Sequence, residues 1–436
     1  MARLLNSAEP GFAADFAALV AEKRAGPSAG NGAAVAEIIA EVRGRGDEAL
    51  IEYSARFDDL ELDAAGLRLR PDEIARAAAE CPVETRDALA FAASRIEDFH
   101  QRQMPAGLDY TDAAGIRLGA RWGALASAGL YVPGGTAAYP SSVLMNAIPA
   151  KVAGVARLVM VVPTPGGALN PAVMAAAEIA GLDEIYRIGG AQAVAALAYG
   201  SETIGAVDKI VGPGNEWVAE AKRQVFGIVG IDMIAGPSEI LVVADGANEA
   251  NWIAADLMSQ AEHDSAAQAI LISDDAGFAE AVAAAVQSLL ETLPRRDIAQ
   301  ASWQAHGAII TVDSLDEVPA LVDRIAPEHL ELAVASPEEL FERVNHAGAV
   351  FLGRHTPEAL GDYVAGPNHV LPTSGSARFS SGLSVYDFLK RSSFAACGEA
   401  GLDEIGPAAR RLAEAEGLDA HALSVALRLD RPVTKV

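Results

Sequence analysis

Between residues 124 and 226, short apolar runs, glycine-containing turns and helical stretches follow one another four times. The apolar runs cover residues 130–132, 158–162, 185–188 and 209–211, and helical stretches follow at 171–180, 191–199 and 216–226. Repetition of strand, turn and helix is typical of a parallel sheet that carries helices on both faces. We therefore predict an α/β unit in this part of the chain.

A second series of the same kind begins at residue 239. Its apolar runs cover residues 239–244, 269–272, 308–311 and 349–352, and alanine-rich helical stretches such as 278–290 and 315–325 separate them. The predicted fold class is therefore α/β, with two tandem Rossmann-like parallel-sheet units. The cleft between two such units is the default ligand site.

Both ends of the chain lack this sheet pattern. Residues 1 to about 110 are predicted as helices, because apolar residues recur there at helical spacing. After the Gly-, Ser- and Pro-containing stretch 371–378, residues 407–416 and 422–427 are predicted as short helices. Such a tail is often a small domain or an arm that reaches a neighbouring subunit.

The composition limits the classes of partner. Of 436 residues, 51% are hydrophobic and 21% are charged, as in a well-buried globular protein. The formal net charge of −26 argues against nucleic acid and anionic membranes, which bind clustered Lys and Arg, and favours a small-molecule substrate or a protein partner. Cys81 and Cys397 form no Cys-x-x-Cys spacing, and signal-peptide and membrane-length apolar segments are absent, so we expect a cytoplasmic protein.

Three of the eight histidines stand in short polar clusters beside carboxylates or amides. Gln260 and His263 are three residues apart in a predicted helix or helix end, so their side chains share a face. Together with Asp362 and His421 they form a donor set that suits Zn²⁺ and leaves positions open for substrate. Spacing alone equally allows a solvated helix face, a capping aspartate and a surface histidine.

Glu328 and His329 place an acid and a base next to each other, directly after Pro327. A histidine base and a glutamate that orients or deprotonates water would suit a two-step oxidation. A hydrogen-bonded surface pair is the alternative.

The turn Gly212-Pro-Gly-Asn215 stands between a predicted strand and a predicted helix. Backbone amides at the start of that helix could face an anionic ligand. The nucleotide-binding fingerprint Gly-x-Gly-x-x-Gly does not occur near these strands, so purely structural turns also explain the glycines.

Longer strings extend these motifs in a specific order along the chain. They lie at residues 129–135, 189–193, 212–215, 230–239, 259–264, 327–331, 361–373, 382–390 and 415–421. With these strings, residues 122–421 resemble the histidinol dehydrogenase family, whose members are zinc- and NAD-dependent enzymes that complete histidine biosynthesis.

The resemblance implies roles for individual residues. It implies that zinc is held by Gln260, His263, Asp362 and His421, and that Glu328 and His329 form the acid–base pair. Besides the metal ligands and His329, the implied substrate contacts are Ser238, His369 and Glu416. The implied NAD contacts are Tyr131, Gln192 and Asn215.

The implied reaction is the four-electron oxidation of L-histidinol to L-histidine through the aldehyde, with two NAD⁺ and water. Zinc would orient the carbinol of the substrate, His329 would accept a proton in each hydride step, and Glu328 would activate the water. The family also implies a homodimer in which the C-terminal arm crosses over. Glu416 and His421 are then expected to serve the partner's site.

Four parts of the chain are expected on this basis. Residues 1–27 are an N-terminal helical arm, and residues 28–130 with 239–383 are a first α/β domain that carries most zinc and acid–base residues. Residues 131–238 are a second α/β domain that binds NAD. Residues 384–436 are a C-terminal arm that completes the neighbour's site.

Three other functions remain open. A paralogous zinc- and NAD-dependent dehydrogenase could oxidise another small alcohol, although His369 and Glu416 favour an imidazole-bearing substrate. A zinc hydrolase could use the same metal ligands with Glu328 as base, although the glycine turns would then be superfluous. A non-catalytic binding module would leave the Glu328–His329 pair without a purpose.

Overall fold

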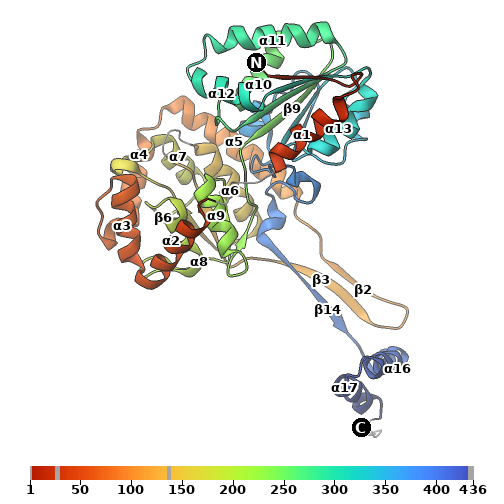
Figure 1. The fold of residues 1–436 in the computed structure, drawn as a ribbon. Coiled ribbons are helices and arrows are strands. Elements are labelled where there is room, and N and C mark those ends of the chain that lie inside the picture. Colours follow the sequence, from red (N-terminus) through yellow and green to blue (C-terminus); the bar gives the residue numbers. More distant parts are fainter. Residues whose placement is uncertain (1, 25–29, 135–138, 431–436) are drawn as a thin grey trace. The chain divides into compact units, whose positions relative to one another are not determined.

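The computed structural model describes residues 2–24, 30–134 and 139–430 (Figure 1). The chain forms two compact units. The body unit consists of Met1–Gln103 and Leu125–Phe388, and the arm unit consists of Met104–Ala124 and Leu389–Val436. Within the described ranges, none of the helices combines the length and the apolar character that a membrane span needs.

The body unit contains a six-stranded parallel sheet with the strand order β1-β11-β10-β9-β12-β13. Its strands are β1 (Arg3–Asn6), β9 (Glu239–Ala244), β10 (Gln268–Ser273), β11 (Ala308–Thr311), β12 (His329–Ala333) and β13 (Ala349–Leu352). The neighbouring strands β9 and β12 are buried along their whole length. Burial on both faces explains why β9 is apolar from its second residue to its end.

Helices cover both faces of this sheet. They are α1 (Phe12–Arg24), α10 (Ala250–Ala261), α11 (Ala276–Leu290), α12 (Arg296–His306) and α13 (Val318–Ile325). Ile240 and Val242 of β9 belong to the core formed with α10, α11 and α12, whereas Leu241 and Val243 belong to the core formed with α1 and α13. Successive residues of the strand thus enter opposite cores.

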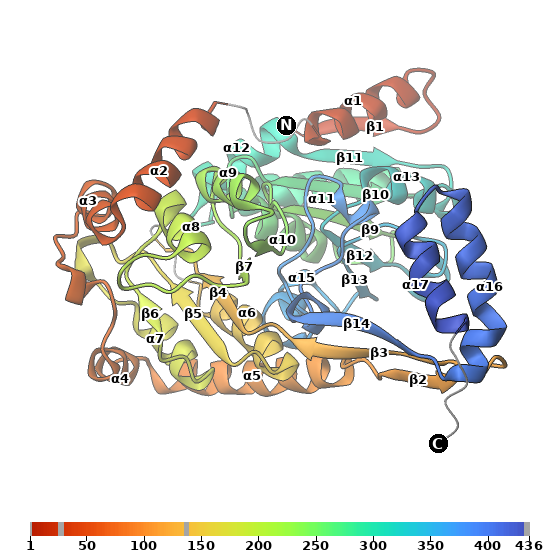
Figure 2. The same ribbon diagram turned by 90° about the horizontal axis from the view of Figure 1, so that it is seen from below.

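A five-stranded parallel sheet forms the rest of the body core, in the order β6-β5-β4-β7-β8 (Figure 2). Its strands are β4 (Ser127–Tyr131), β5 (Arg157–Val161), β6 (Ile185–Tyr186), β7 (Lys209–Val211) and β8 (Gly230–Ile231). Its helices are α2 (Gly32–Arg45), α3 (Asp47–Asp58), α4 (Pro71–Ala79), α5 (Val83–Arg102), α6 (Pro140–Ala153), α7 (Pro171–Ile179), α8 (Gly190–Tyr199) and α9 (Glu216–Val225). The prediction of two parallel-sheet units is confirmed.

Short helices complete the body unit. They are η1 (Ala64–Gly66), η2 (Pro165–Gly167), η3 (Leu315–Glu317), α14 (Pro337–Phe341), α15 (Glu358–Leu360), η4 (Gly361–Ala365), η5 (Ser376–Arg378) and η6 (Val385–Phe388). Two of them, α15 and η4, follow β13 directly and carry side chains of the site described below.

The N-terminal hundred residues differ from the predicted organisation in two ways. Residues Arg3–Asn6 form a strand that pairs with β11, although the whole segment was predicted as helical. A strand of four residues is too short to show a clear period. The apolar faces of α2 and α3 join the core of the five-stranded sheet, whereas residues 28–130 were expected beside 239–383. An amphipathic pattern does not reveal which sheet a helix covers.

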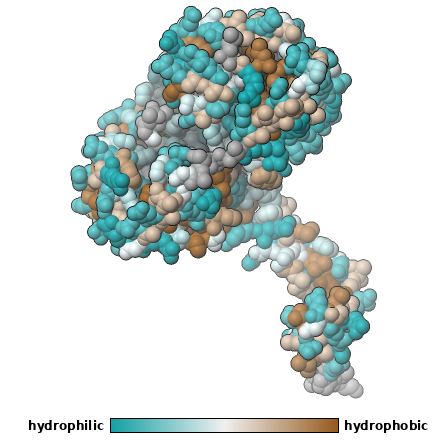
Figure 3. All heavy atoms as spheres, viewed as in Figure 1, coloured by the Kyte–Doolittle hydropathy of each residue, from teal (hydrophilic) through white to brown (hydrophobic). Residues whose placement is uncertain are grey.

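The arm unit consists of a three-stranded antiparallel sheet and two helices. The strands β2 (Leu108–Thr111), β3 (Arg117–Ala124) and β14 (Leu389–Ala396) are ordered β14-β3-β2, and α16 (Glu399–Ala415) contacts α17 (Asp419–Leu429). The predicted C-terminal helices are confirmed, but all three strands were missed. Four leucines of the two helices and the turn between them are exposed: Leu412, Leu418, Leu423 and Leu427. Figure 3 shows hydrophobic residues, in brown, on the surface of this part of the chain.

Candidate active site

Glu328 and His329 lie at the amino end of β12, beside the amino end of β9. The parallel register pairs His329 with Ile240 and so brings Glu328 next to Glu239. The amide nitrogen of Glu239 donates to Glu328 Oε2 at 2.8 Å, and its carbonyl oxygen lies 2.9 Å from His329 Nδ1. The main chain of one residue therefore holds both members of the predicted acid–base pair.

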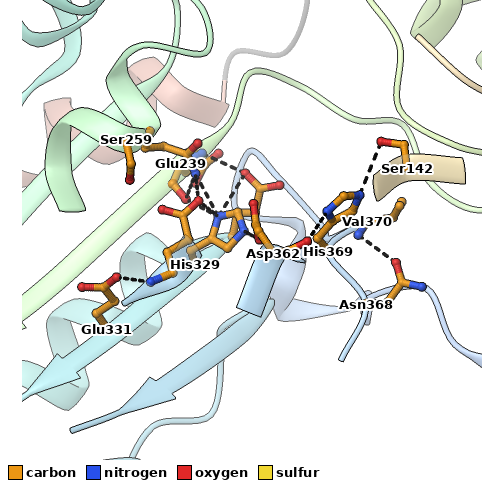
Figure 4. A network of polar contacts seen from close by, with 12 residues as sticks. Ser142, Glu239, Ser259, His329, Glu331, Asp362, Asn368, His369 and Val370 are labelled. Carbon is orange, nitrogen blue, oxygen red and sulfur yellow. Dashed lines mark hydrogen bonds and ion pairs between the residues drawn. The ribbon is translucent and has the colours of Figure 1, made fainter. Parts of the chain in front are cut away.

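The contact with the carbonyl group decides which nitrogen of His329 is basic. A carbonyl oxygen only accepts hydrogen bonds, so Nδ1 carries a hydrogen and Nε2 is the nitrogen that can take up a proton. Nε2 lies 3.3 Å from Asp362 Oδ1, and Figure 4 shows His329 between Glu239 and Asp362. Phe351 stacks on the imidazole ring with the centroids 6.1 Å apart. The contact with the carbonyl oxygen therefore fixes the tautomer of His329, and the stacking contact fixes the orientation of its ring.

Gln260, in the last turn of α10, presents its side-chain amide in one orientation. Its Nε2 lies 3.2 Å from the carbonyl oxygen of Glu239 and 3.2 Å from Glu358 Oε1, and both of these atoms are acceptors. Nε2 is also 2.9 Å from His329 Nδ1, because both nitrogens face the same carbonyl oxygen. The Oε1 atom of Gln260 is buried without a hydrogen-bond partner among the described residues, which leaves it free for a ligand.

Asp362 reaches His329 because Gly361 packs tightly on the neighbouring ring. A Cβ atom at Gly361 would overlap the ring of Phe351, so a larger residue there would displace η4. On its other side, the main-chain carbonyl oxygen of Asp362 lies 2.9 Å from His369 Nδ1. The second ring nitrogen of His369 lies 3.4 Å from Ser142 Oγ on α6, as Figure 4 shows.

The Asp362 carboxylate acts to raise the pKa of each of the three surrounding histidines. Burial lowers the pKa values of His263 and His369, and Asp362 opposes that effect in both. Burial also acts to lower the pKa of His329, but Glu358, Glu328 and Asp362 outweigh it and raise that pKa well above its usual value. Three carboxyl groups of the site thus act together on the imidazole of His329.

Burial acts in the opposite direction on the carboxyl groups of the site. It raises the pKa of Glu328 to about 8 and that of Glu358 to about 7, while the charge of His329 partly offsets the effect. Lys23 of α1 stands 3.6 Å from Glu239 Oε1 and supplies positive charge on one side. A further cation would stabilise the ionised forms of these carboxyl groups.

The donor atoms present fit a divalent metal ion. Ligand atoms of His329, Glu358 and Asp362 lie within 4.8 Å of one another. The unpartnered Oε1 of Gln260 adds an amide oxygen, and His263 follows Gln260 at the end of α10, with its main-chain amide 3.1 Å from the Gln260 carbonyl oxygen. Carboxylate, amide and imidazole donors are those that zinc accepts.

The predicted metal ligands and acid–base residues of the body unit thus form one group, and the predicted residues of the arm unit form another. Ser238 directly precedes Glu239 and is half-buried. Glu416 and His421 are exposed and line a hollow of about 380 Å³ between α16 and α17, together with Leu412 and Leu418. The two predicted arm residues therefore share one surface.

The three predicted NAD contacts lie at βα turns of the five-stranded sheet. Tyr131 ends β4, and its hydroxyl oxygen accepts a hydrogen bond from the amide of Gly190 at 2.9 Å, at the start of α8. Gln192 is buried in the first turn of α8. Asn215 is exposed after β7 and caps α9 through its Oδ1. Carboxyl ends of parallel strands are where such sheets bind ligands.

Sequence reasoning missed Glu239 and Glu358. Glu239 holds Glu328 and His329 through its main chain, and its own carboxylate accepts from the Ser374 amide at 2.5 Å. Glu358 contacts Gln260, and its amide donates to Glu331 Oε1 at 2.5 Å. A glutamate at the start of a predicted buried strand was the available signal for Glu239, because buried carboxylates need a specific reason.

Known proteins match this chain over nearly its full length. The family model described as histidinol dehydrogenase matches residues 23–429. Histidinol dehydrogenases of Rhodospirillum rubrum and Ruegeria pomeroyi are 65% and 62% identical, over 98% and 99% of both chains. The crystal structure of histidinol dehydrogenase from Elizabethkingia anophelis superposes with a TM-score of 0.93 at 36% identity and covers 98% of each chain.

Proposed function

Because the chain belongs to the histidinol dehydrogenase family, we propose that it oxidises L-histidinol to L-histidine with NAD⁺ as electron acceptor. The observation that carries this proposal is the joint attachment of Glu328 and His329 to the main chain of Glu239. A base and a water-activating carboxylate at one point are what two successive oxidations at one carbon require. The paralogous dehydrogenase, the hydrolase and the binding module gain no support from the relatives.

The first oxidation uses His329 alone. Its Nε2 accepts the proton of the substrate hydroxyl as the carbinol carbon gives a hydride to NAD⁺, which leaves an aldehyde and NADH. The Nδ1 hydrogen stays bonded to the carbonyl oxygen of Glu239, so the ring keeps its orientation as it becomes charged. His329 then releases its proton to solvent before the next step.

The second oxidation adds Glu328. Its carboxylate takes a proton from water as the water oxygen bonds to the aldehyde carbon, and it returns that proton to the former carbonyl oxygen, which gives the hydrate. His329 accepts a hydroxyl proton of the hydrate as the second hydride leaves for another NAD⁺. L-histidine therefore gains one oxygen from water, and two NADH form for each L-histidinol.

We assign zinc to the donor atoms around Asp362. Gln260 through Oε1, His263 and Asp362 would hold it, with His421 from a second copy of the chain. A bound zinc ion would act as a Lewis acid toward the imidazole and amino nitrogens of the substrate and so orient the carbinol. The unpartnered Oε1 of Gln260 and the closely spaced donor atoms of His329, Glu358 and Asp362 support this assignment.

We also propose residues that contact the substrate and NAD. Ser238 and His369 would contact L-histidinol from the body unit, and Glu416 would pair with its imidazole or ammonium group. Tyr131, Gln192 and Asn215 would contact NAD at the carboxyl ends of the five-stranded sheet. Support for this cofactor position comes from the strand ends and the helix starts that meet there.

A homodimer is proposed because the arm unit leaves much apolar surface exposed. Of the residues of α16 and α17, only Gly401, Gly406 and Ala422 are buried. The exposed leucines there would be covered by a second copy, which also receives Glu416 and His421 in its site.

Product analysis tests the proposed activity. The purified protein is incubated with NAD⁺ and L-histidinol, and the product is identified by chromatography and mass spectrometry, with L-alaninol as an alcohol that lacks the imidazole. We expect L-histidine from L-histidinol and negligible turnover of L-alaninol. Absence of L-histidine, or equal turnover of the two alcohols, would contradict the proposal.

A further inference from the structure

We propose that Lys222 and Asp232 are positioning residues that set the geometry of the cofactor turn, defined as residues 212–215. The inference rests on the proposed binding of NAD at that turn. Lys222 lies on α9, and Asp232 directly follows β8. Their side chains form an ion pair and are almost completely buried, with exposed fractions of 3% and 1%.

This ion pair uses both polar main-chain groups of Gly212. The amide of Gly212 donates to Asp232 Oδ2 at 2.7 Å, and Lys222 Nζ donates to the carbonyl oxygen of Gly212 at 3.0 Å. Asp232 Oδ1 binds Lys222 and also accepts from the amide of Met233 at 2.6 Å. The ion pair therefore holds both the amide and the carbonyl group of Gly212.

The conformation of Gly212 makes this arrangement specific. Its φ angle of +116° lies in the region that favours glycine, and a Cβ atom there would overlap the carbonyl oxygen of Tyr131. Three residues later, Asn215 Oδ1 accepts from the amides of Trp217 and Val218 at 3.1 and 3.2 Å. Movement of Gly212 would thus be passed on to the cap of α9 and to two of the proposed NAD contacts, Tyr131 and Asn215.

A buried ion pair is a poor way to gain stability alone. Burial of two charges costs about as much as their attraction returns, so apolar residues of similar volume often serve stability equally well. Here the pair binds both polar main-chain groups of one glycine in the cofactor turn. Arg157 and Glu184 form a more exposed ion pair on the same sheet, whose other hydrogen bonds join Gly205, Ala206 and Tyr186 and not that turn.

The test separates positioning from stability with three variants. Lys222→Met leaves a buried carboxylate without its counter-charge, and Asp232→Asn leaves a buried ammonium group. The double variant contains neither charge, and its amide oxygen can still accept from Gly212, but the carbonyl oxygen of Gly212 has lost its donor. Melting temperature, the Kd for NAD⁺ and the KM values for NAD⁺ and L-histidinol are measured for each, with Glu184→Gln as control.

We expect both single variants to melt earlier and the double variant to recover most of the melting temperature. In all three, the Kd and the KM for NAD⁺ should rise on the order of tenfold, because a displaced binding group weakens binding even when the fold is intact. The KM for L-histidinol should change much less. Glu184→Gln should lower the melting temperature and leave the KM for NAD⁺ unchanged.

Three results would overturn the inference. A double variant with the original KM for NAD⁺ would reduce the pair to a stabilising contact, and so would an equal rise in Glu184→Gln. Failure of the unsubstituted protein to bind NAD⁺ would overturn the proposed function together with this inference. NADH formation by the unsubstituted protein distinguishes the two failures.

Discussion

The amide nitrogen of Glu239 donates a hydrogen bond to Glu328 Oε2 at 2.8 Å. This bond comes from the main chain, so it holds the carboxyl group in place whatever residue occupies position 239. It also favours the ionised form of Glu328, in opposition to the burial that raises its pKa to about 8. The main-chain amide of Glu239 thus positions the carboxyl group of Glu328 and also acts to lower its pKa.

Glu328→Gln should separate the two oxidations. The amide oxygen can still accept from Glu239, so the fold should be kept, but the side chain can no longer take a proton from water. We expect kcat to fall roughly 10²- to 10⁴-fold, while the first NADH per site still forms rapidly. Rapid mixing with L-histidinol measures both phases, and equal slowing of the first phase would refute separate roles.

Gly361→Ala should damage the site from a distance. The added methyl group overlaps the ring of Phe351, which stacks on His329, while Asp362 is the next residue in the chain. We expect zinc affinity to fall on the order of tenfold, as when the supports of a metal ligand are disturbed. Equilibrium dialysis against a zinc chelator measures it.

Gly44→Ala is the matched control for that substitution. Gly44 lies in α2, where an added Cβ meets no atom within 4 Å. Alanine there should stabilise the protein by about 1 kcal/mol because of its higher helix propensity, with zinc affinity unchanged. Loss of zinc in both glycine variants would show that Gly361 has no special role.

Subunit exchange tests whether the arm completes a neighbour's site. His421→Asn should lower zinc content and activity, and Glu328→Gln should be inactive overall. In a mixed dimer of the two variants, one site has both an intact body unit and an intact arm unit. An equimolar mixture after random exchange should therefore regain about one quarter of the original activity. No recovery, with mixed dimers verified by mass, would exclude a shared site.

Removal of metal should make stability strongly dependent on pH. Glu328 and Glu358 have pKa values raised to about 8 and about 7 in the folded protein, against an ordinary value of 4.5. A carboxyl group with a raised pKa contributes stability that is complete below its unfolded pKa and is lost as pH rises through the folded pKa. The melting temperature of chelator-treated protein should therefore fall as pH rises from about 4.5 to about 8 and should change little above that. The melting temperature of zinc-loaded protein should fall less over the same pH range. An equal dependence of the melting temperature on pH in both forms would contradict a metal among these carboxylates.

Much of the fold could be predicted because buried parallel strands have a clear signature. The central residues of β9 and β10 are apolar, and long helices follow both strands. The strands β1 and β14 were missed for different reasons. β1 has four residues at a sheet edge, and β14 is mostly exposed, so neither alternates between apolar and polar residues.

The site could be predicted only in part from spacing. Gln260 lies in the last turn of α10 and His263 lies two residues beyond its end, while Glu328 and His329 are adjacent, so these pairs are visible locally. The contribution of Glu239 depends on the register of β9 against β12, and that of Glu358 depends on the path of the chain after β13. Such contacts between distant segments arise only in the folded chain.

The most direct test of the account is the yield of NADH from a limited amount of L-histidinol with excess NAD⁺. If Glu328 and His329 carry out both oxidations at one site, each L-histidinol should give two NADH and one L-histidine, without accumulation of the aldehyde. A yield of one NADH, with the aldehyde as the final product, would contradict the central claim.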